Sequence, residues 1–127
     1  MSTENKTRIL LVDDEVDLAE MTAYQLKANG YHVELADNGL AGLKKLEVFT
    51  PDIIILDLNM PVMGGLEFYD NVLDDQQNPK YPILILTARA YIDDVLENYK
   101  IEGYITKPFE LCNLLDKVTA IKDKFSQ

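Results

Sequence analysis

The sequence predicts an α/β fold with a single doubly wound, five-stranded parallel sheet of the flavodoxin-like type and helices on both faces. Unbroken apolar runs at 9–12, 53–56 and 83–86 are typical of parallel strands that are covered on both faces. Segments with apolar residues at helical spacing separate these runs, as expected for consecutive βαβ units. Because 127 residues is the length of one domain, we expect a single domain over 1–127 with a core of about 8–124.

The first strand is expected at 8–12. The helix after it should end before Gly30, because glycine suits the left-handed residue that closes a helix. Residues 31–35 alternate between apolar and polar side chains, which indicates a half-exposed second strand. A second helix follows, and Pro51 precedes the third strand, which ends at Asp57.

The second half of the chain continues this alternation. Gly64-Gly65 predicts a turn before a third helix, and the fourth strand ends at Thr87. A fourth helix, a short strand at about 103–105 and a last helix complete the pattern. The apolar residues expected to face the sheet from the five helices are Val16, Ala19, Ala23 and Leu26; Leu40, Leu43 and Leu46; Leu66, Tyr69, Val72 and Leu73; Ile92, Val95, Leu96 and Tyr99; and Leu111, Leu114, Leu115, Val118 and Ile121.

The character of the strands predicts their order in the sheet. The three apolar strands belong in the middle, whereas the alternating strand at 31–35 and the short strand at 103–105 suit the edges. Right-handed crossovers then favour the order 2-1-3-4-5. Ligands bind in such sheets at the carboxyl ends of the strands, where this order brings Asp13 and Asp14 beside Asp57.

Charge and cysteine content exclude several classes of protein. With 22 acidic and 12 basic residues the net charge is -10, so we expect no direct binding to nucleic acid and none to a membrane. The start of the chain shows no apolar signal region, and no apolar run has the length of a membrane span. The single cysteine, Cys112, excludes an internal disulfide and fits a cytoplasmic location; we expect it to serve packing, not redox chemistry.

Polar residues at four strand ends predict a site for phosphoryl chemistry. Taken alone, Asp13-Asp14-Glu15 is more often a solvated turn or a helix cap. The three carboxylates of Asp13, Asp14 and Asp57 converge at this edge, however; they repel one another and form an oxygen site suited to Mg²⁺. Thr87 and Lys107 end two further strands and add a hydroxyl and an ammonium group. Together these groups meet the needs of phosphoryl transfer to a carboxylate, which produces an acyl phosphate.

The sequence resembles the receiver domain of bacterial two-component response regulators from Arg8 to about Lys124. The motifs that carry the resemblance are Leu11-Val12-Asp13-Asp14-Glu15, Leu56-Asp57-Leu58-Asn59-Met60-Pro61 followed by Gly64-Gly65, Leu86-Thr87-Ala88, and Thr106-Lys107-Pro108-Phe109. Each motif is weak alone, but the set in this order is highly specific.

The resemblance implies a signalling switch that is not an enzyme, although it supports its own phosphotransfer and dephosphorylation. A histidine kinase or phosphotransfer protein would phosphorylate Asp57. Asp14 and Asp57 would bind Mg²⁺ directly, Asp13 mainly through water, and Asn59 through its backbone carbonyl. The switch is expected to signal to a partner protein or to an output domain outside this chain. The expected oligomeric state is a monomer or a phosphorylation-dependent dimer.

The resemblance also assigns the residues that would hold and read the phosphoryl group. Lys107 would pair with it, Thr87 would close on it, and Tyr104 would then change rotamer. The peptide bond before Pro108 is expected to be cis. The side chains of Asn59 and Arg89 would border the path of the attacking water and so set the lifetime of the phosphoryl group.

The sequence departs from the family pattern at one place, and it leaves several alternative functions to be considered. The span from Thr87 to Lys107 is about two residues shorter than usual, so we expect a trimmed fourth helix and an altered output face. A phosphatase of the haloacid dehalogenase type, with Asp57 as nucleophile, would want a second Asp where Asn59 stands. A flavin carrier would be repelled by the acidic loop, and a vestigial structural module would not need to confine three carboxylates. We expect His32 to be solvated and not a phosphohistidine.

Overall fold

Strands and helices alternate along the chain as the sequence predicts. The computed structural model describes residues 6–58 and 64–125, except for the side chains of Arg89 and Leu96. The elements are β1 (Arg8–Val12), α1 (Val16–Ala28), β2 (His32–Ala36), α2 (Gly39–Leu46), β3 (Ile53–Asp57), α3 (Gly65–Asn71), β4 (Ile83–Ala88), a short 3-10 helix (Arg89–Tyr91), α4 (Ile92–Asn98), β5 (Gly103–Lys107) and α5 (Leu111–Phe125).

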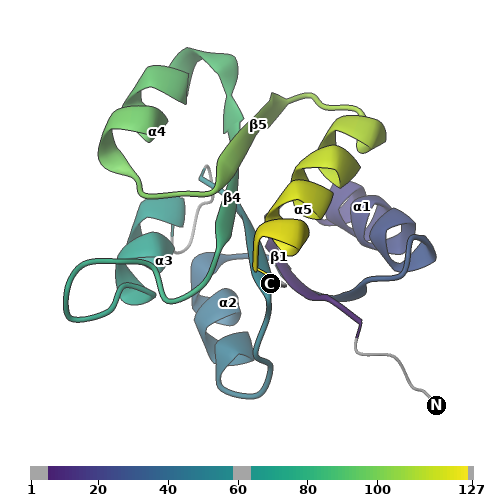
Figure 1. Ribbon diagram of the computed structural model, residues 1–127, viewed down its shortest axis with the longest axis horizontal. Helices are drawn as coiled ribbons and strands as arrows, with labels where there is room; N and C mark the ends of the chain where they lie inside the picture. The colour runs from purple at the N-terminus through teal and green to yellow at the C-terminus, as the bar shows by residue number, and fades with distance from the viewer. Residues whose placement is uncertain (1–5, 59–63, 126–127) are drawn as a thin grey trace.

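The five strands form one parallel sheet in the order β2-β1-β3-β4-β5, which confirms the predicted winding. Helices α1 and α5 cover one face of the sheet, and α2, α3 and α4 cover the other (Figure 1). The alternating strand and the short strand lie at the two edges, as their polarity predicts.

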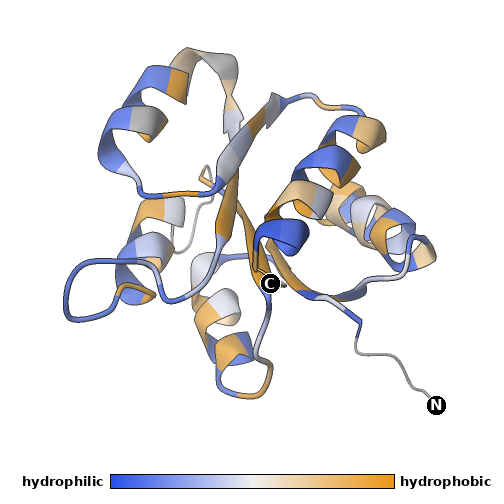
Figure 2. Cartoon of the chain, viewed as in Figure 1, coloured by the Kyte–Doolittle hydropathy of each residue, from blue (hydrophilic) through white to orange (hydrophobic). Residues whose placement is uncertain are grey.

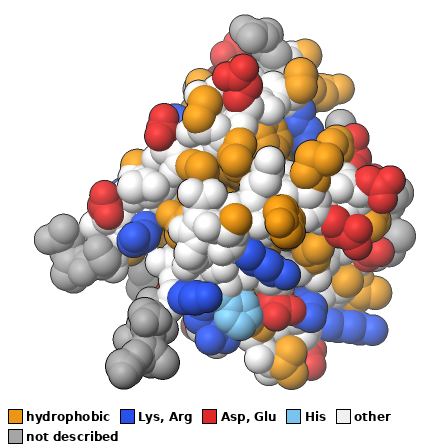
Figure 3. Space-filling model, turned by 90° about the vertical axis from the view of Figure 1, so that its right-hand side faces the viewer, with side chains coloured by type: hydrophobic (Ala, Val, Ile, Leu, Met, Phe, Trp, Pro, Cys, Tyr) orange, Lys and Arg blue, Asp and Glu red, His pale blue; other side chains and the backbone are white. Residues whose placement is uncertain are grey.

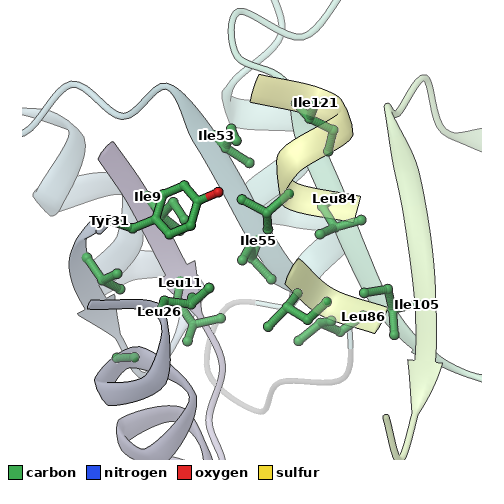
Figure 4. Packing of buried hydrophobic residues seen from close by; sticks show 14 of the residues in the cluster. Ile9, Leu11, Leu26, Tyr31, Ile53, Ile55, Leu84, Leu86, Ile105 and Ile121 are labelled. Carbon is green, nitrogen blue, oxygen red and sulfur yellow. The ribbon is translucent and has the colours of Figure 1, made fainter. Parts of the chain in front are cut away.

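Successive residues of the central strands pack into two separate cores, because side chains alternate between the faces of a strand. Ile9 and Leu11 belong to the core under α1 and α5, which Figure 4 shows from close by. Leu10 and Val12 belong to the core under α2, α3 and α4. Each of these four side chains is at most 1% exposed. Burying one such side chain contributes about 1.5–3 kcal/mol, so the two cores hold the strand ends in place.

Gly30 ends α1 as the sequence predicts. Its φ is +96°, in the left-handed region that glycine adopts without a steric penalty. The Gly30 N–H donates to the carbonyl of Lys27 at 3.0 Å, and the Tyr31 N–H donates to that of Leu26 at 3.2 Å. This is the double hydrogen bond of a Schellman motif, which directs the chain into β2.

Three residues expected to face the sheet are instead exposed. Val16, Leu40 and Leu66 have exposed fractions of 46%, 44% and 55%. Each lies in the first turn of its helix, next to the carboxyl ends of the strands, where the sheet no longer covers a side chain. The residues have helical spacing as predicted, but the buried stripe of each helix begins about one turn later.

The buried anchor of α3 is Phe68, which the sequence analysis did not select. Its side chain is fully buried against α2. A Cβ atom on Gly42 of α2 would lie 2.7 Å from the Phe68 ring, so glycine at this position permits the close approach of the two helices.

β5 runs two residues beyond its predicted end. Thr106 pairs with Thr87 and Lys107 pairs with Ala88, which carries Lys107 to the carboxyl edge of the sheet. Between β4 and β5, α4 has only seven residues. Cys112 is exposed, so the expectation that it packs inside the protein was wrong: it lies on the outer side of α5, whereas Leu114 is buried.

Hydropathy follows this layered arrangement. In Figure 2 the central strands are orange, whereas blue predominates on the loop between α3 and β4 and on the outer parts of α4 and α5. Within the described residues, no helix is both long and apolar enough to span a membrane.

Candidate functional site

The predicted site residues meet at the carboxyl edge of the sheet. Asp57 is the last residue of β3, Asp13 directly follows β1, Thr87 lies near the end of β4 and Lys107 ends β5. The strand register brings these ends level, since Val12 pairs with Leu56 and Thr87 with Thr106. The Asp13 N–H donates to the Ala36 carbonyl at 3.0 Å, which extends the β1–β2 pairing by one residue. The parallel sheet therefore positions the site.

Three carboxylates form a compact oxygen cluster. Asp13, Asp14 and Asp57 each offer an oxygen atom, and these atoms lie within 4.8 Å of one another. Asp13 and Asp57 are only 5% and 3% exposed, and Asp14 is half-buried. Burial keeps water from screening the repulsion, so a cation is needed to balance the cluster. An all-oxygen set of this kind suits a hard divalent cation.

Lys107 supplies one positive charge to the cluster. Its Nζ lies 3.2 Å from an oxygen of Asp13 and 3.2 Å from an oxygen of Asp57. Partial burial lowers the pKa of Lys107, but the bonds to Glu15, Asp57 and Asp13 outweigh this effect and raise the pKa above its usual value. The ammonium group therefore stays charged at every physiological pH.

Glu15 is a member of the site that the sequence analysis did not assign. Its Oε1 lies 2.5 Å from Lys107 Nζ, and its backbone N–H donates to Asp13 Oδ1 at 3.0 Å. The first contact holds the lysine from outside the cluster, and the second orients the Asp13 carboxylate. The signal available in the sequence was its position directly after the two aspartates.

Thr87 is buried beside the acids, with 4% of its surface exposed. Its hydroxyl donates to the carbonyl of Ala88 at 3.3 Å, so it is held within its own strand. Tyr104 lies half-buried on β5, packed against the core under α4, and the Nζ of Lys117 lies 6.0 Å from its ring centroid. The predicted hydroxyl and aromatic residues thus lie on adjacent strands.

Three further predictions concern other positions. The Lys107–Pro108 peptide bond is cis in the structure. Asn59 lies outside the described residues, and so does the side chain of Arg89.

The acids open into a pocket of about 590 Å³ that extends toward α4. Its walls include Asp14, Asp57, Thr87 and Lys107, together with Tyr91, Asp94 and Tyr99 from the α4 region. The Tyr99 ring meets the buried Tyr69 ring edge-on, with centroids 4.8 Å apart. Burial, with a smaller effect of Asp94, raises the pKa of Tyr99. Tyr99 was expected only to face the sheet from the fourth helix, and its place in the pocket wall was not predicted.

The Tyr69 hydroxyl also fixes the chain that follows Tyr99. It accepts the Lys100 N–H at 2.7 Å and lies 3.2 Å from the Lys100 carbonyl oxygen. Lys100 Nζ donates to Asn78 Oδ1 at 2.8 Å. These contacts attach the short segment between α4 and β5 to α3 and to the loop after it.

A doubly wound parallel sheet with three acids, a hydroxyl and a lysine at its carboxyl edge defines a signalling domain of the class that receives a phosphoryl group. A family model described as the response regulator receiver domain matches residues 9–119. The chain therefore belongs to the response regulator receiver domain family, and it is the receiver domain of a two-component response regulator.

Individual relatives agree with this family. The chain is 36% identical over 117 residues to the response regulator ArlR of Staphylococcus saprophyticus, covering 91% of this chain and 52% of ArlR. It is 36% identical over 116 residues to the alkaline phosphatase synthesis transcriptional regulatory protein PhoP of Bacillus subtilis, covering 90% of this chain and 48% of PhoP. The chain thus spans about half the length of the curated relatives it matches.

Solved structures share the fold over nearly the whole chain. The chemotaxis response regulator CheY4 of Vibrio cholerae matches with a TM-score of 0.82 and 34% identity, covering 92% of this chain and 99% of that chain. The response regulator TrrA of Thermotoga maritima, solved in complex with Mg(2+)-BeF, matches with a TM-score of 0.77 and 32% identity over 91% of this chain and 98% of that chain. None of these relatives is a phosphatase of the haloacid dehalogenase type.

Proposed function

We propose that Asp57 accepts a phosphoryl group from a histidine kinase or a phosphotransfer protein in a reaction that requires Mg²⁺. The observation that carries this proposal is the setting of the Asp57 carboxylate. It is buried at the end of β3, its oxygen lies within 4.8 Å of oxygens of two other acids, and the Lys107 ammonium lies 3.2 Å away. A nucleophilic oxygen is thereby placed between groups that bind a cation and a group that binds an anion.

In the proposed transfer, an oxygen of Asp57 attacks the phosphorus of a phosphohistidine. A phosphorus–oxygen bond forms while the phosphorus–nitrogen bond breaks, and the departing imidazole takes up a proton. The product is an aspartyl phosphate. Negative charge spreads over three phosphoryl oxygens during the transfer, and Lys107, which stays protonated, offsets part of this charge. The Thr87 hydroxyl would leave the Ala88 carbonyl and donate to a phosphoryl oxygen.

The carboxylates fit Mg²⁺ as the resident cation. When bound, Mg²⁺ supplies the positive charge that lets a phosphoryl dianion approach three carboxylates. Asp14 and Asp57 would be direct ligands, Asp13 would act mainly through water, and the backbone carbonyl of Asn59 would complete the set from this chain. Charge balance supports this assignment, because Lys107 alone cannot neutralise three acids.

The expected output is a conformational switch. Thr87, drawn toward the phosphoryl group, would vacate space beside β4, and Tyr104 on the neighbouring strand would rotate inward. A partner protein, or an output domain in a longer protein, would read the change on the surface of α4, β5 and α5. Phosphorylation needs only to shift an existing equilibrium by its different contacts with the two states.

In this reading the protein is a signalling component and not an enzyme. It works in the cytoplasm as a monomer or a phosphorylation-dependent dimer, without binding nucleic acid or a membrane itself. The net charge of -10 supports the last point, and the single exposed cysteine suits a reducing compartment.

Arg89 is proposed to lengthen the life of the phosphoryl group. A long cation two residues after Thr87 can reach the phosphoryl oxygens and shield them from water. Arg89→Ala should therefore lose phosphate several-fold faster than the wild type, measured by release of inorganic phosphate after removal of the phosphodonor. Equal rates of phosphate release from the variant and the wild type would show that Arg89 does not affect the lifetime of the phosphoryl group.

The proposed function is tested with small phosphodonors. Acetyl phosphate should label the wild type only when Mg²⁺ is present, and Asp57→Asn should abolish the acid- and base-labile phosphate. Asp75→Asn is the matched control, because Asp75 is an exposed carboxylate that does not line the pocket at the acids. Unchanged labelling of Asp57→Asn, or labelling in EDTA, would overturn the assignment. Continuous turnover of p-nitrophenyl phosphate would instead favour a phosphatase.

A further inference from the structure

A second cavity lies at the opposite edge of the sheet from Asp57. It measures about 770 Å³ and is larger than the pocket at the acids. Lys6, Arg8, His32 and Lys122 line it with basic side chains. Pro82, Ile121 and Phe125 add apolar surface, and the Phe125 side chain is 53% exposed. We call this cavity the amino-edge pocket.

The basic groups of the amino-edge pocket are held in place by the strand ends. Arg8 Nε donates to the Thr50 carbonyl at 3.0 Å, and its guanidinium carbon lies 4.5 Å from the centroid of the Phe49 ring. The His32 ring lies 5.4 Å from the same buried ring. The backbone N–H of His32 donates to the Thr7 carbonyl at 2.9 Å, and its ring Nε2 lies 3.3 Å from Glu34 Oε2. A guanidinium group fixed in this way loses little side-chain freedom when it binds a carboxylate.

The charge of the pocket is opposite to that of the molecule. Three of its lining residues are lysine or arginine, namely Lys6, Arg8 and Lys122, although the whole chain carries a net charge of -10. Asp52 also lines the pocket and offsets one of these charges; one of its oxygens accepts the backbone N–H of Arg8 at 2.8 Å. In Figure 3 several Lys and Arg side chains gather around the histidine in the lower part of the face, and an acidic side chain lies beside it. This concentration of positive charge favours an anionic partner.

The combination of basic and apolar surface limits which chemical classes of partner fit the pocket. The pocket offers only a few cations, and outside it the acidic chain, with its net charge of -10, would repel the phosphate backbone of a nucleic acid. A small inorganic anion would use the cations but leave the exposed Phe125 ring and its apolar neighbours in water. A short protein segment that carries acidic side chains beside a bulky apolar side chain would use both kinds of surface.

We propose that the amino-edge pocket docks an acidic, apolar-anchored segment of a partner protein, and that this docking does not depend on phosphorylation. Ile53 lines the pocket and Asp57 ends the same strand. Four residues of extended chain separate the two by about 13 Å. A partner seated at the pocket therefore leaves the acids open to a phosphodonor, so the receiver can be tethered and phosphorylated at the same time.

The test uses an acetylated peptide amide, Asp-Glu-Leu-Phe-Glu-Asp, and its neutral analogue Asn-Gln-Leu-Phe-Gln-Asn. The ¹H–¹⁵N spectrum of the full chain is titrated with each peptide at low ionic strength. The acidic peptide should shift the amide signals of the pocket, with those at the acids unmoved. Saturating beryllofluoride with Mg²⁺ should leave its affinity unchanged.

Charge-reversal variants locate the binding. The double variant Lys6→Glu/Lys122→Glu should bind the acidic peptide at least about fivefold more weakly, because two exposed ion pairs are replaced by repulsion. Lys27→Glu/Lys44→Glu is the matched control: it makes the same change in net charge at exposed lysines that do not line the pocket.

Any of four results would overturn the proposal: equal binding of the neutral peptide, equal weakening in both double variants, shifts centred away from the pocket, or an affinity for the acidic peptide that changes with beryllofluoride. None of these results depends on phosphotransfer to Asp57, so the docking proposal can fail while the proposed function stands, and the reverse is also true.

Discussion

Replacing Asp57 by Asn should stabilise the protein when Mg²⁺ is removed. The oxygens of Asp13, Asp14 and Asp57 lie within 4.8 Å of one another. At an effective dielectric constant of about 20, two unit charges at this separation repel by about 3.5 kcal/mol. Asp57 takes part in two such repulsions, and the one with half-buried Asp14 is smaller because water screens it.

The substitution also removes an attraction. Lys107 lies 3.2 Å from Asp57, which corresponds to about 5 kcal/mol at the same dielectric constant. Lys107 keeps Asp13 and Glu15 as partners in the variant. The two lost repulsions therefore slightly exceed the lost attraction. We expect a gain of about 1–2 kcal/mol, or roughly 4–8 °C in the midpoint of thermal unfolding for a chain of this length.

Binding of Mg²⁺ should reverse this order of stability. A cation that binds only the folded state at 100 times its dissociation constant adds about 2.7 kcal/mol, or roughly 10 °C. The wild type should show this gain, and Asp57→Asn should show little of it because one of the proposed ligands has lost its charge.

Circular dichroism melts in EDTA and in MgCl₂ at matched ionic strength measure both effects, with Asp75→Asn as the control that changes neither. An Asp57→Asn variant that melts below the wild type in EDTA would refute the repulsion argument. An equal Mg²⁺ response in the two proteins would refute the metal site.

Three other substitutions, one of them with a matched control, test the structure around the site. Tyr69→Phe leaves the Lys100 N–H without its acceptor, so it should cost about 1–3 kcal/mol in urea unfolding and speed hydrogen exchange between α4 and β5. Gly65→Ala should cost about 1–3 kcal/mol, since its Cβ would lie 2.5 Å from the backbone just after β3; Gly103→Ala, whose nearest contact is 3.5 Å, should cost much less. Thr87→Ala should still bind beryllofluoride but lose the accompanying NMR shifts on α4 and β5; retained shifts would exclude Thr87 as the switch.

The architecture could be predicted because it depends on the type and period of the side chains. Continuous apolar runs distinguish buried parallel strands from the alternating strand at 31–35, and the right-handed crossover then leaves one favoured order. That order carries Asp13, Asp14 and Asp57 to one edge, because parallel strands end on the same side. The convergence of the acids was thus contained in the sequence.

The sequence could not predict which apolar side chains would be covered at the ends of elements. Val16, Leu40 and Leu66 have the spacing of buried residues, yet the sheet ends before their helical turns. Phe68 is buried because Gly42 lets α2 and α3 approach, a contact between residues far apart in the chain. Local periodicity carries no information about where a neighbouring element stops.

Only the tertiary structure decided the contacts made by side chains from distant segments. The bond between Glu15 and Lys107 spans 92 positions, and that between Tyr69 and Lys100 spans 31. The amino-edge pocket likewise brings Arg8 and Lys122 together from opposite ends of the chain. Composition and period determined that a sheet would form with its acids at one edge. The directions of individual side chains, and the cavities left between them, depend on how the packed elements meet in space.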